Sequence, residues 1–234
     1  MTAPEETRSF AAWRGERPDA RFTDWLVARA EPHWSRAVGH RFTRELAADT
    51  LPDAVYRRYL IQDYAFVDVL VRVVAYGIAK APDMPPKSRL SAFLAAVTSG
   101  ENDYFLRSFD ALGVAPETWR NAPLGPTAGA FRDLMMQAAE TGAYEEVLAV
   151  FLPAEWCYLS WARAVAGQAP ARFYLKEWIE LHDNADFEAF VTWLRDEMDR
   201  CATGLPAERQ EGLAALFRGM MALEAAFFDE AYEG

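Results

Sequence analysis

Cysteine and histidine are scarce in this chain of 234 residues, which contains two of the first and three of the second. Cys157 and Cys201 fall in helical patterns without metal or redox spacing, which favours two buried thiols in a reducing cytoplasm. His33, His40 and His182 lack metal-ligand spacing, and no Glu-x-x-His motif recurs as in a di-iron bundle. The sequence therefore predicts no metal site.

Basic side chains are also few, because 24 Lys and Arg stand against 35 Asp and Glu, giving a formal net charge of -11. Nucleic acids and anionic membranes both need basic patches, so neither is expected as a partner. No apolar run is long enough to span a bilayer, and residues 1–9 are polar, unlike a signal peptide. These absences predict a cytoplasmic protein.

Motifs for nucleotide and nucleophile chemistry are missing: there is no phosphate loop, no glycine-rich dinucleotide fingerprint and no recognisable Ser or Cys nucleophile motif. No cofactor is therefore expected. Strand-like alternation is missing too, and the apolar periodicity predicts an all-α, single-domain bundle of about eight helices. We expect residues 1–20 to form a flexible N-terminal arm and residues 21–234 the helical domain. The longer helices are expected at 22–38 (bent at Pro32), 52–80, 87–112, 127–141, 143–166, 171–182, 185–203 and 206–232.

Acidic residues on apolar helices are the informative feature of a chain that is 52% hydrophobic and 14% aromatic. Glu155 is the one carboxylate in the apolar run 150–161, close to Pro153, which should bend the helix. A buried carboxyl needs a partner or takes a raised pKa, which suits a general acid or base. The alternative is that Glu155 pairs with an Arg across a helix interface.

Asp63 and Glu224 lie in similar apolar and aromatic surroundings. If the carboxyl groups of Asp63, Glu155 and Glu224 converge, they could hold an amino-bearing heterocycle among aromatic walls. Crowding would then separate their pKa values and supply one acid and one base. The alternative is that each is a solvated or salt-bridged helix residue and that the neighbouring aromatic rings are simply core.

An ordered set of short motifs runs through the chain after residue 22. The motifs are His40-Arg41-Phe42, Asp49-Thr50-Leu51-Pro52, Tyr59-Leu60-Ile61-Gln62-Asp63, Pro126-Thr127-Ala128, Leu152-Pro153, Trp156 with Tyr158, Glu177-Trp178-Ile179, and Glu224 with Phe227 and Phe228. In this order they resemble the TenA family, also called thiaminase II. The resemblance implies a bundle like that of haem oxygenase, but without haem. It also implies hydrolysis of aminopyrimidines derived from thiamin, releasing hydroxymethylpyrimidine for salvage.

The resemblance implies roles for individual residues. Asp63 matches the aspartate that binds the pyrimidine amino group and ring nitrogen, and Glu224 matches the late catalytic glutamate. The matching substrate-binding side chains are Phe66, Phe131, Tyr158 and His182. Three of these, Phe66, Phe131 and His182, stand where the family usually has Tyr. Because each change removes a phenolic hydroxyl, the substrate is expected to differ from thiamin itself.

The catalytic element departs from the common branch of that family. Ala154 stands where that branch has its nucleophilic Cys, and Cys157 lies three residues further along the helix, so it faces another direction. Glu155 and Tyr158 resemble a second, Cys-less branch. The resemblance thus implies that Glu155 and Glu224 share acid and base duties on an aminomethyl- or formylaminomethyl-pyrimidine, with little hydrolysis of thiamin.

Two other functions stay open. One is a non-catalytic member of the same fold that binds a small molecule or a partner. The other is the quinone-cofactor oxidase branch, which ranks lowest because its chemistry depends on several His and Arg residues. We also expect a homo-oligomer, a tetramer or a dimer, since TenA-like proteins are commonly dimers of dimers and eight Trp exceed what one core easily absorbs. The three carboxyl groups should face one enclosed cavity walled by Phe66, Phe131, Tyr158 and Trp156 or its neighbours.

Overall fold

Residues 8–233 are described by the structure, a computed structural model. They contain no strand and eight helices of ten or more residues, which confirms the predicted all-α bundle. The long helices are α5 (Asp53–Lys80), α6 (Met84–Ala96), α7 (Asn102–Ala111), α9 (Pro126–Thr141), α10 (Tyr144–Ala164), α11 (Phe173–His182), α12 (Ala185–Ala202) and α13 (Ala207–Glu230). The short ones are α1 (Phe10–Glu16), α2 (Phe22–Ala30), α3 (His33–Val38), α4 (Arg41–Ala47) and α8 (Pro116–Trp119).

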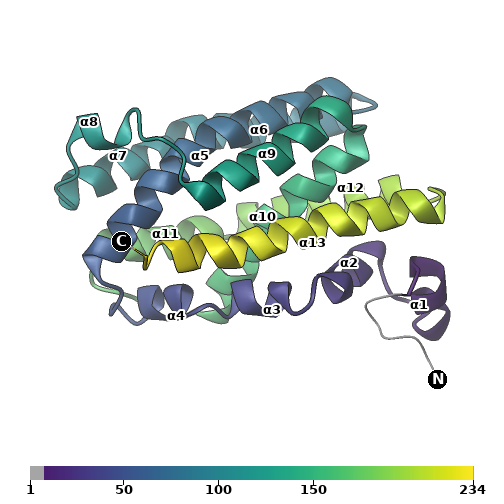
Figure 1. The fold of residues 1–234 in the computed structure, drawn as a ribbon, viewed down its shortest axis with the longest axis horizontal. Helices are drawn as coiled ribbons and strands as arrows, with labels where there is room; N and C mark the ends of the chain where they lie inside the picture. The colour runs from purple at the N-terminus through teal and green to yellow at the C-terminus, as the bar shows by residue number, and fades with distance from the viewer. Residues whose placement is uncertain (1–7, 234) are drawn as a thin grey trace.

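Helix α10 lies at the centre of the bundle. It packs against α5, α9, α12 and α13, and fourteen of its 21 residues are buried, so it is surrounded by other helices as its sequence predicts. Figure 1 shows α5, α6 and α9 along the upper side of the molecule and α2 to α4 along the lower side, with α13 between them. Pro153 lies inside α10, and the helix continues past it.

The segment expected as one bent helix, residues 22–38, is two helices, α2 and α3. Pro32 separates them because proline has no backbone N–H to donate to the preceding turn. Its ring also disfavours the helical conformation for the residue before it, and Glu31 is extended, with φ -66 and ψ 145.

The helix expected at residues 87–112 is likewise divided. Helix α6 begins earlier, at Met84, since Pro85 and Pro86 occupy its first turn, where a missing N–H removes no hydrogen bond. A π-helical turn, Val97–Glu101, then joins α6 to α7. Such a turn inserts an extra residue and rotates everything after it around the helix axis.

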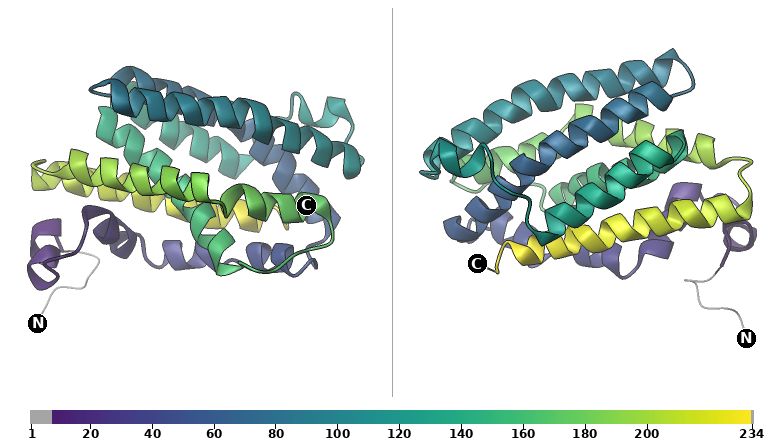
Figure 2. Two further views of the ribbon diagram at one scale, coloured as in Figure 1. Left: turned by 180° about the vertical axis from the view of Figure 1, so that it is seen from behind. Right: turned by 45° about the horizontal axis from the view of Figure 1, so that its top comes forward.

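The predicted arm, residues 1–20, lies partly outside the described residues. From residue 8 onward it includes α1, which lies at one end of the bundle in Figure 2. The ring centroid of Phe10 is 5.1 Å from that of Phe22 and 5.8 Å from that of Trp25, so α1 packs on α2. The domain boundary at residue 21 stays a prediction.

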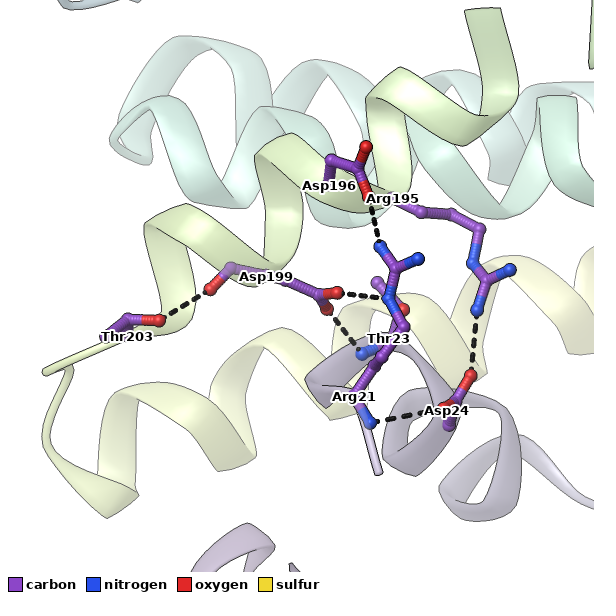
Figure 3. Close-up of polar contacts among 7 residues, drawn as sticks. All are labelled: Arg21, Thr23, Asp24, Arg195, Asp196, Asp199 and Thr203. Atoms are coloured by element: carbon purple, nitrogen blue, oxygen red, sulfur yellow. Dashed lines mark hydrogen bonds and ion pairs between the residues drawn. The ribbon is translucent and has the colours of Figure 1, made fainter. Parts of the chain in front are cut away.

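Ion pairs attach α2 to α12 (Figure 3). The Arg21 guanidinium donates to Asp196 at 2.6 Å and to Asp199 at 2.5 Å, and Arg195 donates to Asp24 at 2.8 Å. The N-terminal helices are thereby fixed to the element whose other end borders the cavity described below. No helix among residues 8–233 is both long and apolar enough to cross a membrane.

Candidate active site

One large cavity opens among the long helices, with a volume of about 720 Å³. That volume is in the range of small-molecule sites. Its walls come from α5, α6, the π-helical turn, α9, α10, α11, α12 and α13. All seven predicted site residues line it: Asp63, Phe66, Phe131, Glu155, Tyr158, His182 and Glu224. Side chains that lie on five different helices therefore share one space, although their spacing in the sequence could not show this.

Asp63 projects from α5 into the cavity and is 9% exposed. Burial raises the pKa of its carboxyl group, and the charge of Glu101 raises it further. The Tyr59 hydroxyl faces Asp63 and lowers this pKa by hydrogen bonding, while it also lies 2.8 Å from the Tyr158 hydroxyl. Despite that opposing contact, the pKa stays well above its usual range, so this environment favours the neutral form of Asp63.

Glu155 on α10 and Glu224 on α13 are 8% and 3% exposed, and their helices pack side by side. Within residues 8–233 neither carboxyl group forms a hydrogen bond or an ion pair, so the alternative of an Arg partner for Glu155 is wrong. Burial raises both pKa values well above normal. Glu101, Glu224 and Asp63 raise that of Glu155 further, and Asp63 raises that of Glu224. Unpaired buried acids are costly, and they cluster at functional sites.

Glu101 is a fourth carboxyl group in the cavity, and sequence reasoning missed it. It is the last residue of the π-helical turn, where the pattern predicted an uninterrupted helix. Burial raises its pKa to about 7, which leaves part of it ionised at neutral pH. The only hint in the sequence is the stretch Ser99-Gly100 before it, two residues with weak helix propensity.

Aromatic rings form much of the wall around these acids. The Phe66 and Phe131 ring centroids are 5.4 Å apart, and Phe131 lies 6.0 Å from Phe227. On another side Tyr158 lies 4.9 Å from His182, which in turn lies 4.5 Å from Trp178. A flat heterocycle fits between such faces.

Trp156 does not line the cavity, so the prediction that named it or its neighbours as wall is wrong for Trp156 itself. Its ring packs 4.8 Å from Trp34, with the Arg195 guanidinium 4.0 Å from its centroid. The reason is geometric, because consecutive helix residues point about 100° apart, and Glu155 already faces the cavity.

His182 is neutral in this setting. Burial lowers its pKa to about 4, and Nδ1 lies 2.8 Å from the Trp178 carbonyl oxygen. Since a carbonyl only accepts, Nδ1 carries the proton and donates it, which leaves Nε2 as an acceptor. The ring that replaces a phenol here therefore accepts a hydrogen bond rather than supplying a positive charge.

The position that holds the nucleophile in the Cys-containing branch is open to the cavity. Ala154 lines it and is 8% exposed, whereas Cys157 is 0% exposed and lies off the lining. Burial also raises the pKa of the Cys157 thiol well above normal, which opposes the thiolate form. Cys157 thus has neither the position nor the protonation state of a nucleophile.

Basic side chains are nearly absent from the described lining of the cavity. Of the described residues that line the cavity, Arg89 is the single Lys or Arg, and it is exposed, as are Asn184 and Asp186. Among residues 8–233 no group of three or more His, Cys, Asp and Glu has the arrangement of a metal site. Within residues 8–233, the lining therefore offers these four acids no basic side chain other than Arg89.

The fold and this cavity define a class: an all-α bundle that encloses an acid-lined, aromatic-walled site for a small molecule. The chain belongs to the TENA/THI-4/PQQC family, whose family model matches residues 27–234. It is 27% identical over 214 residues to an aminopyrimidine aminohydrolase of Halalkalibacterium halodurans, covering 90% of this chain and 95% of that protein. It is 24% identical over 213 residues to an aminopyrimidine aminohydrolase of Helicobacter pylori, covering 90% and 98%.

Solved structures share the fold. A TenA homologue from P. horikoshii superimposes with a TM-score of 0.82 at 22% identity, covering 92% of this chain and 99% of that one. A TenA homologue from Pyrococcus furiosus gives a TM-score of 0.79 at 21% identity, covering 90% and 100%. At this identity the likeness concerns the fold alone, and the chemistry rests on the cavity.

Proposed function

We propose that the protein is a hydrolase of the C–N bond in thiamin-derived aminopyrimidines, of the Cys-less type that uses two glutamates. The observation that carries the proposal is the pair of buried, unpaired acids Glu155 and Glu224, which share one aromatic-walled cavity with Asp63. The two relatives named as aminopyrimidine aminohydrolases support it. Ala154 at the nucleophile position supports the Cys-less assignment.

Asp63 binds the polar edge of the pyrimidine in this proposal. In the neutral form, which burial favours, its O–H donates to the ring nitrogen while its carbonyl oxygen accepts from the amino group. Two hydrogen bonds at fixed spacing recognise an aminopyrimidine and orient it. The rings of Phe66 and Phe131 pack against the heterocycle.

Glu155 and Glu224 then perform the proton transfers. Water attacks the exocyclic methylene carbon, the new C–O bond forms, and the proton of the water passes to the glutamate of the pair that is ionised. The C–N bond pair leaves with the nitrogen, which the other, protonated glutamate keeps protonated so that it departs as ammonia. Because the two carboxyl groups raise each other's pKa, the pair favours one ionised and one protonated glutamate, which is the arrangement that these two steps need.

The test is turnover of aminomethyl- and formylaminomethyl-pyrimidine by the purified protein and its variants. Glu155→Gln and Glu224→Gln should each lower kcat by at least about 100-fold with little change in KM, because each removes a proton-transfer group. Glu197→Gln is the matched control, since Glu197 is also a buried glutamate but pairs with Arg200 at 2.7 Å away from the cavity.

The outcomes separate the alternatives. If wild type and both glutamine variants are equally inert, the enzyme hypothesis is wrong. Binding of the pyrimidine without turnover would favour the non-catalytic member of the fold. Asp63→Ala should mainly weaken binding, because it removes both the donor and the acceptor that face the pyrimidine, whereas Asp63→Asn keeps one of each and should bind more nearly like wild type.

Assembly as a homo-oligomer, a tetramer or a dimer, and residence in the cytoplasm are also proposed, on the family resemblance. Of the eight Trp, four are buried in the single chain and four, Trp34, Trp119, Trp156 and Trp193, are partly exposed. The oligomer therefore stays a prediction. Light scattering at micromolar concentration decides the point, and a monomer alone would contradict oligomerisation.

A further inference from the structure

We propose that Glu101 is the specificity-determining residue of this cavity: its carboxylate binds the protonated amine of the substrate, so that the site selects a cationic aminomethyl-pyrimidine over neutral analogues. This inference rests on the proposed function and names the substrate class within it. Glu101 is the fourth acid of the lining, from a wall that the two catalytic glutamates do not share.

The position of Glu101 relative to the other acids suits this role. Apart from burial itself, the charge of Glu101 does most to raise the pKa values of Asp63 and Glu155, so its carboxyl group lies within electrostatic reach of both. In an aminopyrimidine the exocyclic methylene group is attached to the ring carbon next to the one that carries the amino group. A ring held at Asp63 through that amino group therefore presents its methylene amine to the space that Asp63, Glu155 and Glu101 surround.

The charge balance of the cavity calls for a cation. Five acidic residues line the cavity, the four described above and the exposed Asp186, and the single basic lining residue within the described part of the chain is the exposed Arg89. His182 is neutral and offers no compensation. Glu155 and Glu224 are more than nine-tenths buried and have no hydrogen-bond partner among residues 8–233. A bound ammonium group would satisfy this site, because opposite charges attract strongly where water is excluded.

Among these four acids Glu101 is the best placed to supply the charge. It is partly exposed, whereas Asp63, Glu155 and Glu224 are buried, and deeper burial favours the neutral form of a carboxyl group. Its pKa of about 7 leaves part of it ionised at neutral pH. The π-helical turn is what brings Glu101 to the cavity, and such turns are frequent at functional sites.

The experiment compares two probes of nearly the same shape. One is the aminomethyl-pyrimidine, a cation at neutral pH, and the other is the neutral hydroxymethyl-pyrimidine. Both are titrated by calorimetry in a Glu224→Gln background, where turnover is slow enough for binding to be recorded. Three variants are compared: Glu224→Gln alone, Glu224→Gln combined with Glu101→Gln, and Glu224→Gln combined with Asp103→Asn. Asp103 is the matched control because it is an exposed acid two residues away that lies off the cavity.

We expect Glu101→Gln to weaken binding of the amine by about tenfold or more, and to change binding of the alcohol by less than about twofold, since only the amine loses a charge-assisted hydrogen bond. Asp103→Asn should leave both affinities unchanged. The inference is overturned if Glu101→Gln affects both probes equally or neither, or if Asp103→Asn has the same effect, which would indicate a long-range charge rather than a contact.

The outcome is distinguishable from failure of the proposed function. If wild type does not hydrolyse the amine but Glu101→Gln still removes its preference for the cation, the hydrolase proposal fails and the role of Glu101 in cation binding stands. If wild type hydrolyses the amine and its preference for the cation does not depend on Glu101, the hydrolase proposal stands and the role of Glu101 in cation binding fails. Binding of neither probe would overturn both.

Discussion

The pKa of Glu101 predicts how stability should depend on pH. Its carboxyl group titrates near 4.5 when unfolded and at about 7 when folded. Between these values the folded protein binds one proton more than the unfolded chain, so the free energy of unfolding falls as pH rises, by about 1.4 kcal/mol per pH unit. The contribution is fully present below about pH 4.5 and is lost as pH passes through about 7.

The magnitude follows from these two pKa values. From pH 5 to pH 8 the loss assigned to Glu101 is at most roughly 2 to 3 kcal/mol, and partial solvent exposure reduces it to about 1 to 2 kcal/mol. Glu101→Gln should therefore stabilise the protein more at pH 8 than at pH 5 by that amount. For a chain of this length the gain corresponds to roughly 2 to 8 °C in Tm.

Urea unfolding of wild type, Glu101→Gln and Asp103→Asn at the two pH values measures this difference. The readout is the change in the stability gap between variant and wild type, in which the contributions of groups remote from Glu101 cancel. Asp63 and Glu155 do not cancel, because Glu101 raises their pKa values, and its removal widens the gap in the same direction. The gap for Asp103→Asn should be the same at both pH values. An equal gap for Glu101→Gln at pH 5 and pH 8 would refute the placement of its carboxyl group in a desolvated cavity.

Three further predictions concern the wall and the core. Ala154→Cys should place a thiol in the cavity wall that alkylating reagents reach, while Cys157 stays unreactive in the folded protein. The new thiol should not confer thiamin hydrolysis, because the surrounding acids disfavour a thiolate. Wild type should hydrolyse thiamin far more slowly than its best aminopyrimidine, and Cys157→Ser should leave kcat for that aminopyrimidine within about threefold, which steady-state assays will check. Phe228→Ala should lower the free energy of unfolding by about 3 to 5 kcal/mol in urea titrations, since Phe228 is fully buried and stacks 5.0 Å from Phe42.

Much of the fold is predictable because its helices begin and end at residues with a local reason to do so. Gly142 ends α9, and Asn184 caps α12 by accepting a hydrogen bond from the Phe187 N–H at 2.9 Å. Apolar periodicity between such positions gives each long helix except α6 and α7, which it merges into one. The π-helical turn at residues 97–101 that divides them was not predictable in this way, because a single inserted residue is too small a break for the periodic pattern to detect.

The site was predictable in its chemistry but not in its geometry. Asp63, Glu155 and Glu224 stand out because they are acids in apolar helices, and the family resemblance, not the spacing, supplied the expectation that they meet. Glu101 was missed for the opposite reason, since its neighbours in the sequence, Gly100 and Asn102, resemble a solvated helix surface. The face of the helix on which Glu101 lies depends on a one-residue shift of helical register. A periodic pattern that is read over many residues does not detect such a shift.

The unpaired acids have a stability cost that ligand chemistry explains better than folding does. Each buried carboxyl group without a partner costs the fold about 1 to 3 kcal/mol relative to a satisfied one, and an apolar residue at Glu155 or Glu224 would avoid that cost. A protein selected only for stability would not place both, together with Asp63 and Glu101, around one space. An aminopyrimidine with a protonated amine supplies what they lack: an amino group and ring nitrogen for Asp63, a positive charge for Glu101, and a reacting centre between the two glutamates.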